Sequence, residues 1–271
     1  MHDTRFRMLL DYLGLSWSGY REVRKGVRKR IAKHMQQLGS KDVESYIRLL
    51  DNDPKLKEQA EIMMSVSISR FFRDRKLWEV LKNRILPEFV IEKCNKITIW
   101  SAGCGCGQEV YSIKIVWTCL KQRIASLPLL EIVATDLNPA YLEKARGGIY
   151  SSSSLKEVTP EEKERFFKSI TGKNSFCVVP ELKEQILWKV HHLSSNPPGE
   201  QFQMIFLRNS VLTYYEEPKK TAILKKVINS LAPSGLFIIG SHEKLPPPTE
   251  SALEPVPPFS YVFKKITASS E

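Results

Sequence analysis

The sequence ITIWSAGCGCGQEVYSI (residues 97–113) decides the fold class of this 271-residue chain. Its first part, ITIWSAG, is a short apolar run rich in β-branched residues, which is typical of a buried parallel strand. Three glycines follow at alternate positions, Gly103, Gly105 and Gly107, and a helical stretch begins at Glu109. Glycines let the backbone turn tightly and approach a ligand without hindrance from side chains. This strand, turn and helix predict a ligand-binding turn at the carboxyl end of a parallel strand.

The alternation of strands and helices continues after this turn. Three further apolar runs, EIVATD (residues 131–136), QMIFLRN (203–209) and GLFIIGS (235–241), are typical of strands, and helical stretches lie between them. Strands that alternate with helices predict a doubly wound α/β sheet, which we assign to residues 88–271. The segments FCVV and QILWKV, within residues 167–192, interrupt the alternation and predict a small antiparallel β insertion.

The first third of the chain predicts a small all-helical domain over residues 1–87. Apolar residues recur there at helical spacing, without β-like alternation. Residues 1–89 carry 19 Lys/Arg against 12 Asp/Glu, so most of the net charge of +11 lies in this part. A basic helix over residues 21–33 has Arg21, Arg24, Lys25 and Arg28 on one face, which is broadened by Lys29, Arg30 and Lys33.

This basic face allows two interpretations. It is either the solvated side of a helix that packs on the core or a surface for an anionic partner. Nucleic acid, anionic lipid and an acidic protein helix all fit the second interpretation, and charge alone does not choose among them.

The composition excludes several classes of protein. An apolar content of 42% and a charged content of 26% are ordinary for a globular protein. No apolar run approaches the roughly 18 residues of a membrane span, and no cleavable leader is recognisable, so we expect a cytoplasmic protein. The cysteines are odd in number and show no C-x-x-C pairing, which argues against a disulfide framework: Cys94, Cys104, Cys106, Cys119 and Cys177.

Two of these cysteines, Cys104 and Cys106, lie within the glycine turn. A structural zinc site needs a full tetrahedral set of ligands, and no second cysteine pair is present. Small residues in a tight turn explain both positions, and we predict no metal site.

The ligand of the glycine turn is indicated by two neighbouring positions. A dinucleotide-binding turn would have glycine where Gln108 stands, so a nucleoside without a pyrophosphate fits better. Asp136 ends the next strand, at the edge of the sheet where ligands bind, and its carboxylate could accept both hydroxyls of a ribose. The alternative is that Asp136 or Asn138 only caps the helix that follows.

Five longer blocks of sequence extend beyond the turn. They are SISRFFRD (residues 67–74), IWSAGCGCGQEVYS (99–112), ATDLNPAYLEKARGGIY (134–150), MIFLRNSVLTYY (204–215) and IIGSHE (238–243). In this order they resemble the CheR family of protein-glutamate methyltransferases, and the likeness covers nearly the whole chain. The resemblance implies a Rossmann-like methyltransferase domain that binds S-adenosylmethionine, with a helical N-terminal domain and an inserted β subdomain. It also implies an enzyme that forms glutamyl methyl esters on a receptor or receptor-like protein.

The resemblance implies which residues form the site. The positions that match the family's cofactor-binding residues or form the glycine turn are Ser67, Ser69, Arg73, Gly103, Gly105, Gly107, Glu109, Asp136, His192, Leu193, Arg208 and Asn209. Arg73 and Tyr214 are the candidate catalytic residues, because they match the residue nearest the methionine end and the active-site tyrosine. The family commonly has Asn where His192 stands. The segment before Tyr214 is longer than in the enterobacterial form, so Tyr215 remains an alternative.

On this interpretation the partner of the basic helix is an acidic, helical, chemoreceptor-like protein, and neither nucleic acid nor membrane insertion is expected. Two alternatives stay open: a methyltransferase of the same fold that acts on a small molecule or RNA, and a non-catalytic module that senses the cofactor. No recognisable RNA-binding module accompanies the basic helix. Retention of Arg73, Asp136, Asn209 and Tyr214 argues against a non-catalytic module.

Overall fold

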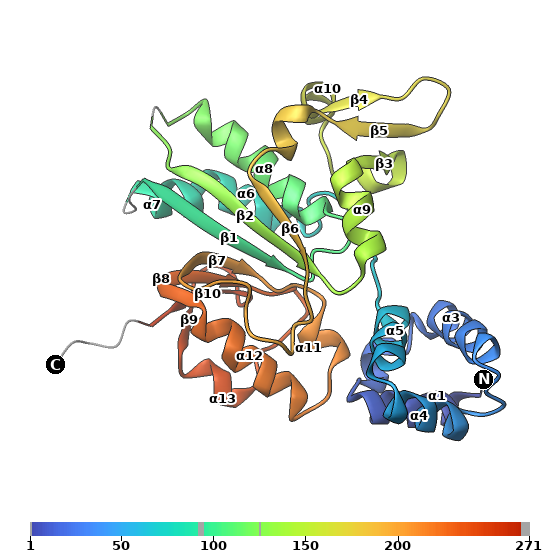
Figure 1. Ribbon diagram of the computed structural model, residues 1–271. Helices are drawn as coiled ribbons and strands as arrows, with labels where there is room; N and C mark the ends of the chain where they lie inside the picture. The colour runs from blue at the N-terminus through green and yellow to red at the C-terminus, as the bar shows by residue number, and fades with distance from the viewer. Residues whose placement is uncertain (1, 92–94, 125, 267–271) are drawn as a thin grey trace.

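A computed structural model of the protein describes residues 2–91, 95–124 and 126–266. Figure 1 shows a bundle of N-terminal helices beside an α/β domain, which carries a small extra sheet at one edge. An extended segment after Met64 joins the bundle to the rest of the chain. In these described ranges, no helix is both long enough and apolar enough to cross a bilayer.

The N-terminal bundle is built from α1 (Asp3–Leu13), α2 (Trp17–Tyr20), α3 (Arg24–Gln37), α4 (Val43–Asn52) and α5 (Pro54–Met64). Its apolar stripes meet in a core of their own, in which Phe6, Ile31 and Tyr46 are fully buried. Polar side chains fix the helix starts. The carboxylate of Asp42 accepts a hydrogen bond from the Ser45 N–H at 2.7 Å, and Asp53 caps α5 in the same way.

The central sheet consists of β1 (Lys96–Ala102), β2 (Leu129–Asp136), β6 (Ile186–Val190), β7 (Phe202–Phe206), β8 (Leu231–Ile238), β9 (Leu253–Pro255) and β10 (Val262–Lys265). The strands lie in the order β6-β2-β1-β7-β8-β10-β9. The first five are parallel, while β10 is antiparallel to both β8 and β9. The chain leaves β1 towards β2 on one side and reaches β7 on the other, so the end of β1 is a topological switch point. The predicted doubly wound α/β fold is confirmed.

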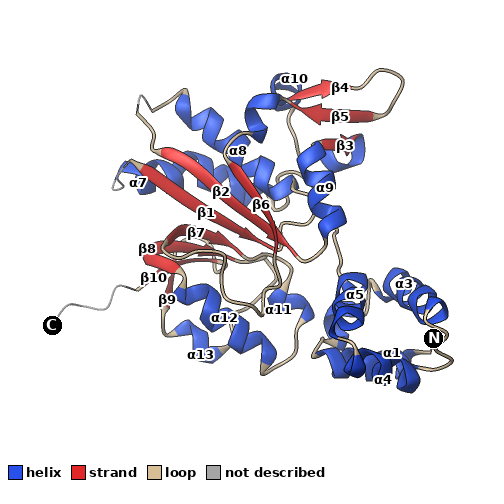
Figure 2. Ribbon diagram, viewed as in Figure 1, coloured by secondary structure: helices blue, strands red, loops and turns tan. Residues whose placement is uncertain are grey.

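Helices cover both faces of this sheet (Figure 2). One face packs against α6 (Arg75–Val80), a π-helical turn (Leu81–Ile85), α7 (Leu86–Ile91), α8 (Gln108–Lys121) and α9 (Pro139–Gly147). The other packs against α11 (Val211–Tyr214), α12 (Lys219–Asn229) and α13 (Pro247–Glu250). Strand β1 serves both cores: Ile97 and Ile99 face the first, and Trp100 and Ala102 face the second. This explains why its sequence is apolar throughout rather than alternating.

The hydrophobic cores indicate where the boundary between the N-terminal bundle and the α/β domain lies. Leu77 and Trp78 of α6 pack in the core of the sheet, whereas the core of the N-terminal bundle ends with Met64. We therefore propose a division after Met64, earlier than the expected one between residues 87 and 88.

The small antiparallel sheet lies partly outside the range expected for it. It consists of β3 (Ile149–Ser151), β4 (Phe167–Ser169) and β5 (Ser175–Val178) in the order β3-β5-β4, with α10 (Pro160–Phe166) and the 3-10 turns Ser152–Leu155 and Pro180–Lys183 nearby. The insertion was expected within residues 167–192, but QILWKV forms β6 and pairs in parallel with β2. The expectation was wrong for this segment because β6 is an edge strand. Its half-exposed pattern resembles that of an antiparallel strand.

Candidate active site

The glycine turn after β1 is held against the end of β2. The N–H groups of Gly103 and Cys104 donate to the Thr135 carbonyl at 2.8 and 2.9 Å. Gly103 and Gly105 have φ angles of 79° and 55°, in the region that favours glycine. A Cβ on Gly105 would lie 2.8 Å from the Ser67 hydroxyl, so the turn and the SISRFFRD block approach closely only because no side chain intervenes.

Gly107 has a different task from the other two glycines. A Cβ there would lie 2.8 Å from the Ala145 Cβ and 3.0 Å from the Trp188 ring. Its φ of 84° starts α8, and the missing side chain lets α8 pack against α9 and β6. Gly107 lines neither of the pockets described below.

Asp136 projects from the end of β2 beneath the same turn. Its Oδ2 accepts a hydrogen bond from the Gly105 N–H, and its Oδ1 accepts one from the Asn138 N–H, each at 2.9 Å. Burial raises the pKa of Asp136, although these backbone donors oppose the rise. Each carboxylate oxygen keeps a second lone pair, so the group can still accept hydrogen bonds from a ligand. Asn138, not Asp136, caps α9, because its side chain accepts from the Ala140 N–H at 3.0 Å.

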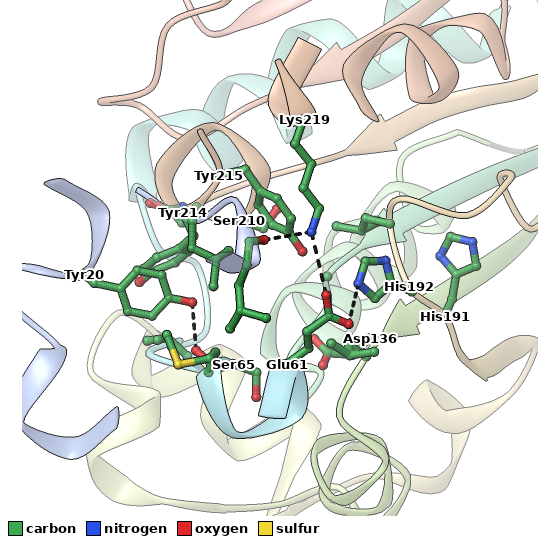
Figure 3. A pocket seen from close by; sticks show the side chains of 18 residues that line it. Tyr20, Glu61, Ser65, Asp136, His191, His192, Ser210, Tyr214, Tyr215 and Lys219 are labelled. Atoms are coloured by element: carbon green, nitrogen blue, oxygen red, sulfur yellow. Dashed lines mark hydrogen bonds and ion pairs between the residues drawn. The ribbon is translucent and has the colours of Figure 1, made fainter. Parts of the chain in front are cut away.

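Two pockets adjoin at the glycine turn. The first, which we call the Asp136 pocket, lies between the N-terminal bundle and the sheet (Figure 3). The second, the Arg73 pocket, lies under the SISRFFRD block. Both are lined by Val66, Gly103 and Asn209, so one elongated ligand could occupy them together.

The expected site residues divide between these pockets. Those in the Asp136 pocket are Gly103, Asp136, His192, Leu193, Asn209 and Tyr214. Those in the Arg73 pocket are Ser67, Ser69, Arg73, Gly103, Gly105, Glu109, Arg208 and Asn209. All expected residues except Gly107 therefore line one or both of these adjoining pockets, although they come from distant parts of the sequence.

A buried ion-pair cluster lines the Arg73 pocket through Glu109 and Arg208. The side chain of Arg208 is only 4% exposed, and its guanidinium donates to Glu109 at 3.1 Å and to Asp74 at 2.7 Å. The Ser101 hydroxyl holds the other oxygen of Glu109 at 2.8 Å. Although burial raises the pKa of Asp74, the charge of Arg208 holds it below its ordinary value. Arg208 follows β7, Glu109 lies in α8 and Asp74 ends the SISRFFRD block, so the cluster joins these three segments. Arg208 and Glu109 hold each other in position beside the pocket.

Arg73 also lines this pocket. One of its guanidinium nitrogens donates to the Ile68 carbonyl at 3.0 Å. A guanidinium has five N–H donors in a planar fork, which leaves Arg73 able to bind a carboxylate in a bidentate manner. The hydroxyl of Ser67 lies 3.7 Å from the Cys106 sulfur.

The two candidate tyrosines differ in their surroundings. Tyr214, at the end of α11, packs on Tyr20 with 5.0 Å between ring centroids. Burial raises the pKa of Tyr214; the positive charge of Arg73 opposes that rise, and the negative charge of Glu243 adds to it. Burial also raises the pKa of Tyr215, and there the neighbouring charges are those of Glu61 and Asp136. Both tyrosines line the Asp136 pocket, but the charged groups that act on them differ.

The Asp136 pocket also contains a charged cluster that the sequence did not predict. Glu61 of α5 lies 3.3 Å from the His192 Nε2 and 3.7 Å from the Lys219 ammonium, as Figure 3 shows. The His192 Nδ1 accepts a hydrogen bond from the Ser194 N–H at 3.0 Å, so its proton resides on Nε2 and faces Glu61. Burial raises the pKa of Glu61, but His192 and Lys219 together hold it below its ordinary value. Lys219 also donates to the Leu13 carbonyl at 3.1 Å, so this cluster ties the N-terminal bundle to the sheet.

The surroundings of Cys104 and Cys106 bear on metal binding. Across the described residues, no group of three or more His, Cys, Asp or Glu side chains could hold a metal ion. Burial raises the pKa of the Cys104 thiol well above its usual range, which disfavours the thiolate that metals bind. Cys94 lies outside the described residues.

A family model described as "CheR methyltransferase, SAM binding domain" matches residues 67–258. The chain belongs to the CheR methyltransferase family. This finding confirms the predicted family, the methyltransferase activity and S-adenosylmethionine as the cofactor. The Arg73 pocket is lined by matched residues except Val66, whereas the Asp136 pocket is also lined by residues of the N-terminal bundle.

Curated relatives agree with this assignment. The chain is 28% identical to a chemotaxis protein methyltransferase of Listeria innocua over 256 residues, which cover 94% of each chain. It is 32% identical to chemotaxis protein methyltransferase 1 of Pseudomonas aeruginosa, with 81% of each chain covered. A probable chemotaxis protein methyltransferase of Rhizobium etli is 30% identical, with 81% of this chain and 84% of the relative covered.

Proposed function

We propose that this CheR-family enzyme methylates glutamate side chains on the helical cytoplasmic domain of a chemoreceptor-like protein. The observation that carries the proposal is the pair of adjoining pockets, one lined by the carboxylate of Asp136 and the other by the guanidinium of Arg73. This polarity suits a cofactor with ribose hydroxyls at one end and an amino acid carboxylate at the other. Curated relatives are named as chemotaxis methyltransferases, which supports the receptor as acceptor.

Each end of the cofactor has a proposed partner. Asp136 accepts the ribose hydroxyls, and Leu193 and His192 contact the adenine side. Arg73 binds the methionine carboxylate, with Ser67 and Ser69 beside it. The fit is supported by the glycine turn between the two ends, where the backbone can approach a ligand without side chains.

The proposed methyl transfer does not need a general base. A glutamate side chain has a pKa of about 4.3 and is already ionised at neutral pH. S-adenosylmethionine supplies an electrophilic methyl group on a sulfonium. The protein therefore has to align the acceptor carboxylate and exclude water. Charge is neutralised during the transfer, so a tight Arg clamp on the acceptor would stabilise the ground state more than the transition state.

Tyr214 is accordingly the residue that we propose for orienting the acceptor. Its hydroxyl is neutral and can donate a hydrogen bond without adding charge. The positive charge of Arg73 acts on Tyr214, whereas the charges that act on Tyr215 are those of Glu61 and Asp136. This difference supports Tyr214 over Tyr215.

The acceptor helix is proposed to bind along α3. Arg24 and Arg28, which were expected to face the partner, pair with Asp3 of α1, and Arg21 pairs with Glu22. Arg30 of α3 donates to the carbonyls of Met63 and Ser65. The exposed lysines of α3 make no ion pair within the described residues and lie four residues apart: Lys25, Lys29 and Lys33. We name these three the lysine stripe. It is complementary to a glutamate-rich helix, and the proposal places this encounter in the cytoplasm.

A transfer assay with labelled S-adenosylmethionine tests the acceptor. Receptor fragments, small carboxylic acids and total RNA are offered in parallel, and only the receptor fragments should become labelled. Label on RNA or on small acids alone would contradict the proposal and favour one of those acceptors instead.

Charge reversal tests the lysine stripe. Changing all three stripe lysines to Glu should raise KM for a receptor fragment, most strongly at low salt, because exposed pairs contribute about 0.2–1 kcal/mol each and are screened. Cofactor affinity should not change. The matched control variant changes three exposed lysines outside the N-terminal bundle to Glu: Lys76, Lys144 and Lys225. Equal KM values for both triple variants at every salt concentration would remove α3 from the proposal.

A further inference from the structure

The IIGSHE block contains a carboxylate at the centre of three segments. Glu243 follows β8, and its Oε2 accepts hydrogen bonds from the N–H groups of Asn209 at 2.8 Å and Gly240 at 2.7 Å. Its Oε1 accepts a hydrogen bond from the Thr213 hydroxyl at 2.6 Å. One side chain therefore joins the end of β7, the helix α11 and the turn after β8.

Two of these donors belong to segments that need external support. Asn209 has a φ of 52°, a left-handed conformation that costs energy for a residue with a side chain. Thr213 lies in α11, which has only four residues and no side-chain cap at Ser210. A helix of this length is not stable alone. Both segments are held by the hydrogen bonds that they donate to Glu243.

The packing around Glu243 leaves little freedom. A Cβ on Gly240 would lie 2.8 Å from the Glu243 Oε2 and 3.0 Å from the Asn209 Nδ2. The carboxylate and the amide are thus confined against the backbone of the turn. Loss of the Glu243 carboxylate would therefore remove support from both Asn209 and α11.

These residues border both pockets. Asn209 lines the Asp136 pocket and the Arg73 pocket, and Tyr214 follows Thr213 directly and lines the Asp136 pocket. Glu243 itself lines neither pocket. It can influence the reaction through the residues that it holds, and its negative charge also raises the pKa of Tyr214.

We propose that Glu243 is a positioning residue for methyl transfer, which sets Asn209 against the cofactor and, through Thr213, sets Tyr214 against the acceptor. The inference rests on the roles proposed above for Asn209 and Tyr214. It also assigns a role to the IIGSHE block, none of whose side chains lines either pocket.

Replacement of Glu243 separates its geometry from its charge. In Glu243→Gln the amide oxygen can accept from both backbone N–H groups, and the amide nitrogen can donate to the Thr213 hydroxyl. Glu243→Ala loses all three hydrogen bonds. We expect Glu243→Ala to raise the Kd for S-adenosylhomocysteine about 10-fold or more and to lower kcat, whereas Glu243→Gln stays within about 3-fold of the wild type.

Thr213→Val supplies a second, milder test. It removes only the hydrogen bond to α11, so kcat should fall several-fold while the Kd for S-adenosylhomocysteine stays unchanged. The matched control is Asp42→Ala, which removes a carboxylate that accepts the Ser45 N–H in the N-terminal bundle. It should lower thermal stability without changing either Kd or kcat.

Calorimetry with S-adenosylhomocysteine needs no acceptor, so the binding arm is independent of whether receptors are the substrate. Wild-type Kd in Glu243→Ala, with a loss of thermal stability like that of Asp42→Ala, would show that Glu243 serves stability alone. If Glu243→Ala does not fold, Thr213→Val and Glu243→Gln still test whether Glu243 is a positioning residue. A wild-type kcat in Thr213→Val, or a Glu243→Gln enzyme with strongly weakened Kd, would overturn the proposal.

Discussion

Replacing Asp136 with alanine should weaken the binding of S-adenosylhomocysteine by about 1.5–3 kcal/mol, the scale of a lost hydrogen bond to a charged group. The carboxylate spends one lone pair of each oxygen on the N–H groups of Gly105 and Asn138. The remaining lone pairs are available to the two ribose hydroxyls. Alanine removes both acceptors, and water that enters the vacated space restores part of the loss. The net effect is therefore about one charge-assisted bond, or a 10- to 150-fold rise in Kd.

Isothermal titration of S-adenosylhomocysteine measures this effect directly. The matched control is Asp53→Ala, because Asp53 also accepts two backbone N–H groups, from Lys55 and Leu56, but lines neither pocket. Its loss should lower thermal stability while leaving Kd unchanged. Equal Kd values for wild type and Asp136→Ala would remove Asp136 from the cofactor site.

Three further outcomes follow from the site. Tyr214→Phe should lower turnover about 5- to 30-fold with little change in cofactor Kd, since one hydrogen bond to the acceptor is lost; that pattern in Tyr215→Phe instead would reassign the acceptor-orienting role. Glu61 has a folded-state pKa below its ordinary value, so its stabilising contribution is present above about pH 4.5 and is lost as the pH falls through the lowered pKa. Denaturant titrations should therefore show Glu61→Gln less stable than wild type at neutral pH, with the difference vanishing in acid, whereas a pH-independent difference would exclude the ion pairs as its cause. Elemental analysis of protein purified without chelator should find no stoichiometric metal at Cys104 and Cys106, and about one zinc per chain would contradict this.

The local parts of the site could be predicted from the sequence. The strand, the glycine turn and Asp136 follow one another within about forty residues, and parallel strands bring their carboxyl ends to one edge of the sheet. The family resemblance supplied Arg73, Asn209 and Tyr214, which come from distant parts of the chain.

Contacts between distant segments could not be predicted in this way. Glu61 and Lys219 look like ordinary surface charges on amphipathic helices until the N-terminal bundle folds against the sheet. The pairing of Arg24 and Arg28 with Asp3 depends on how α1 crosses α3, which helical spacing does not encode. The direction of β6 was likewise undetermined, because an alternating edge strand can join either kind of sheet.

Identification of the methylated bond tests whether this enzyme esterifies glutamate side chains of a receptor. A receptor fragment is incubated with enzyme and S-adenosylmethionine, and mass spectrometry locates the added methyl group before and after mild base treatment. We expect methyl groups on glutamate side chains that base removes as methanol, and their loss when those glutamates are replaced by alanine. Base-stable methyl groups, or methylation of the fragment at residues other than glutamate, would contradict it.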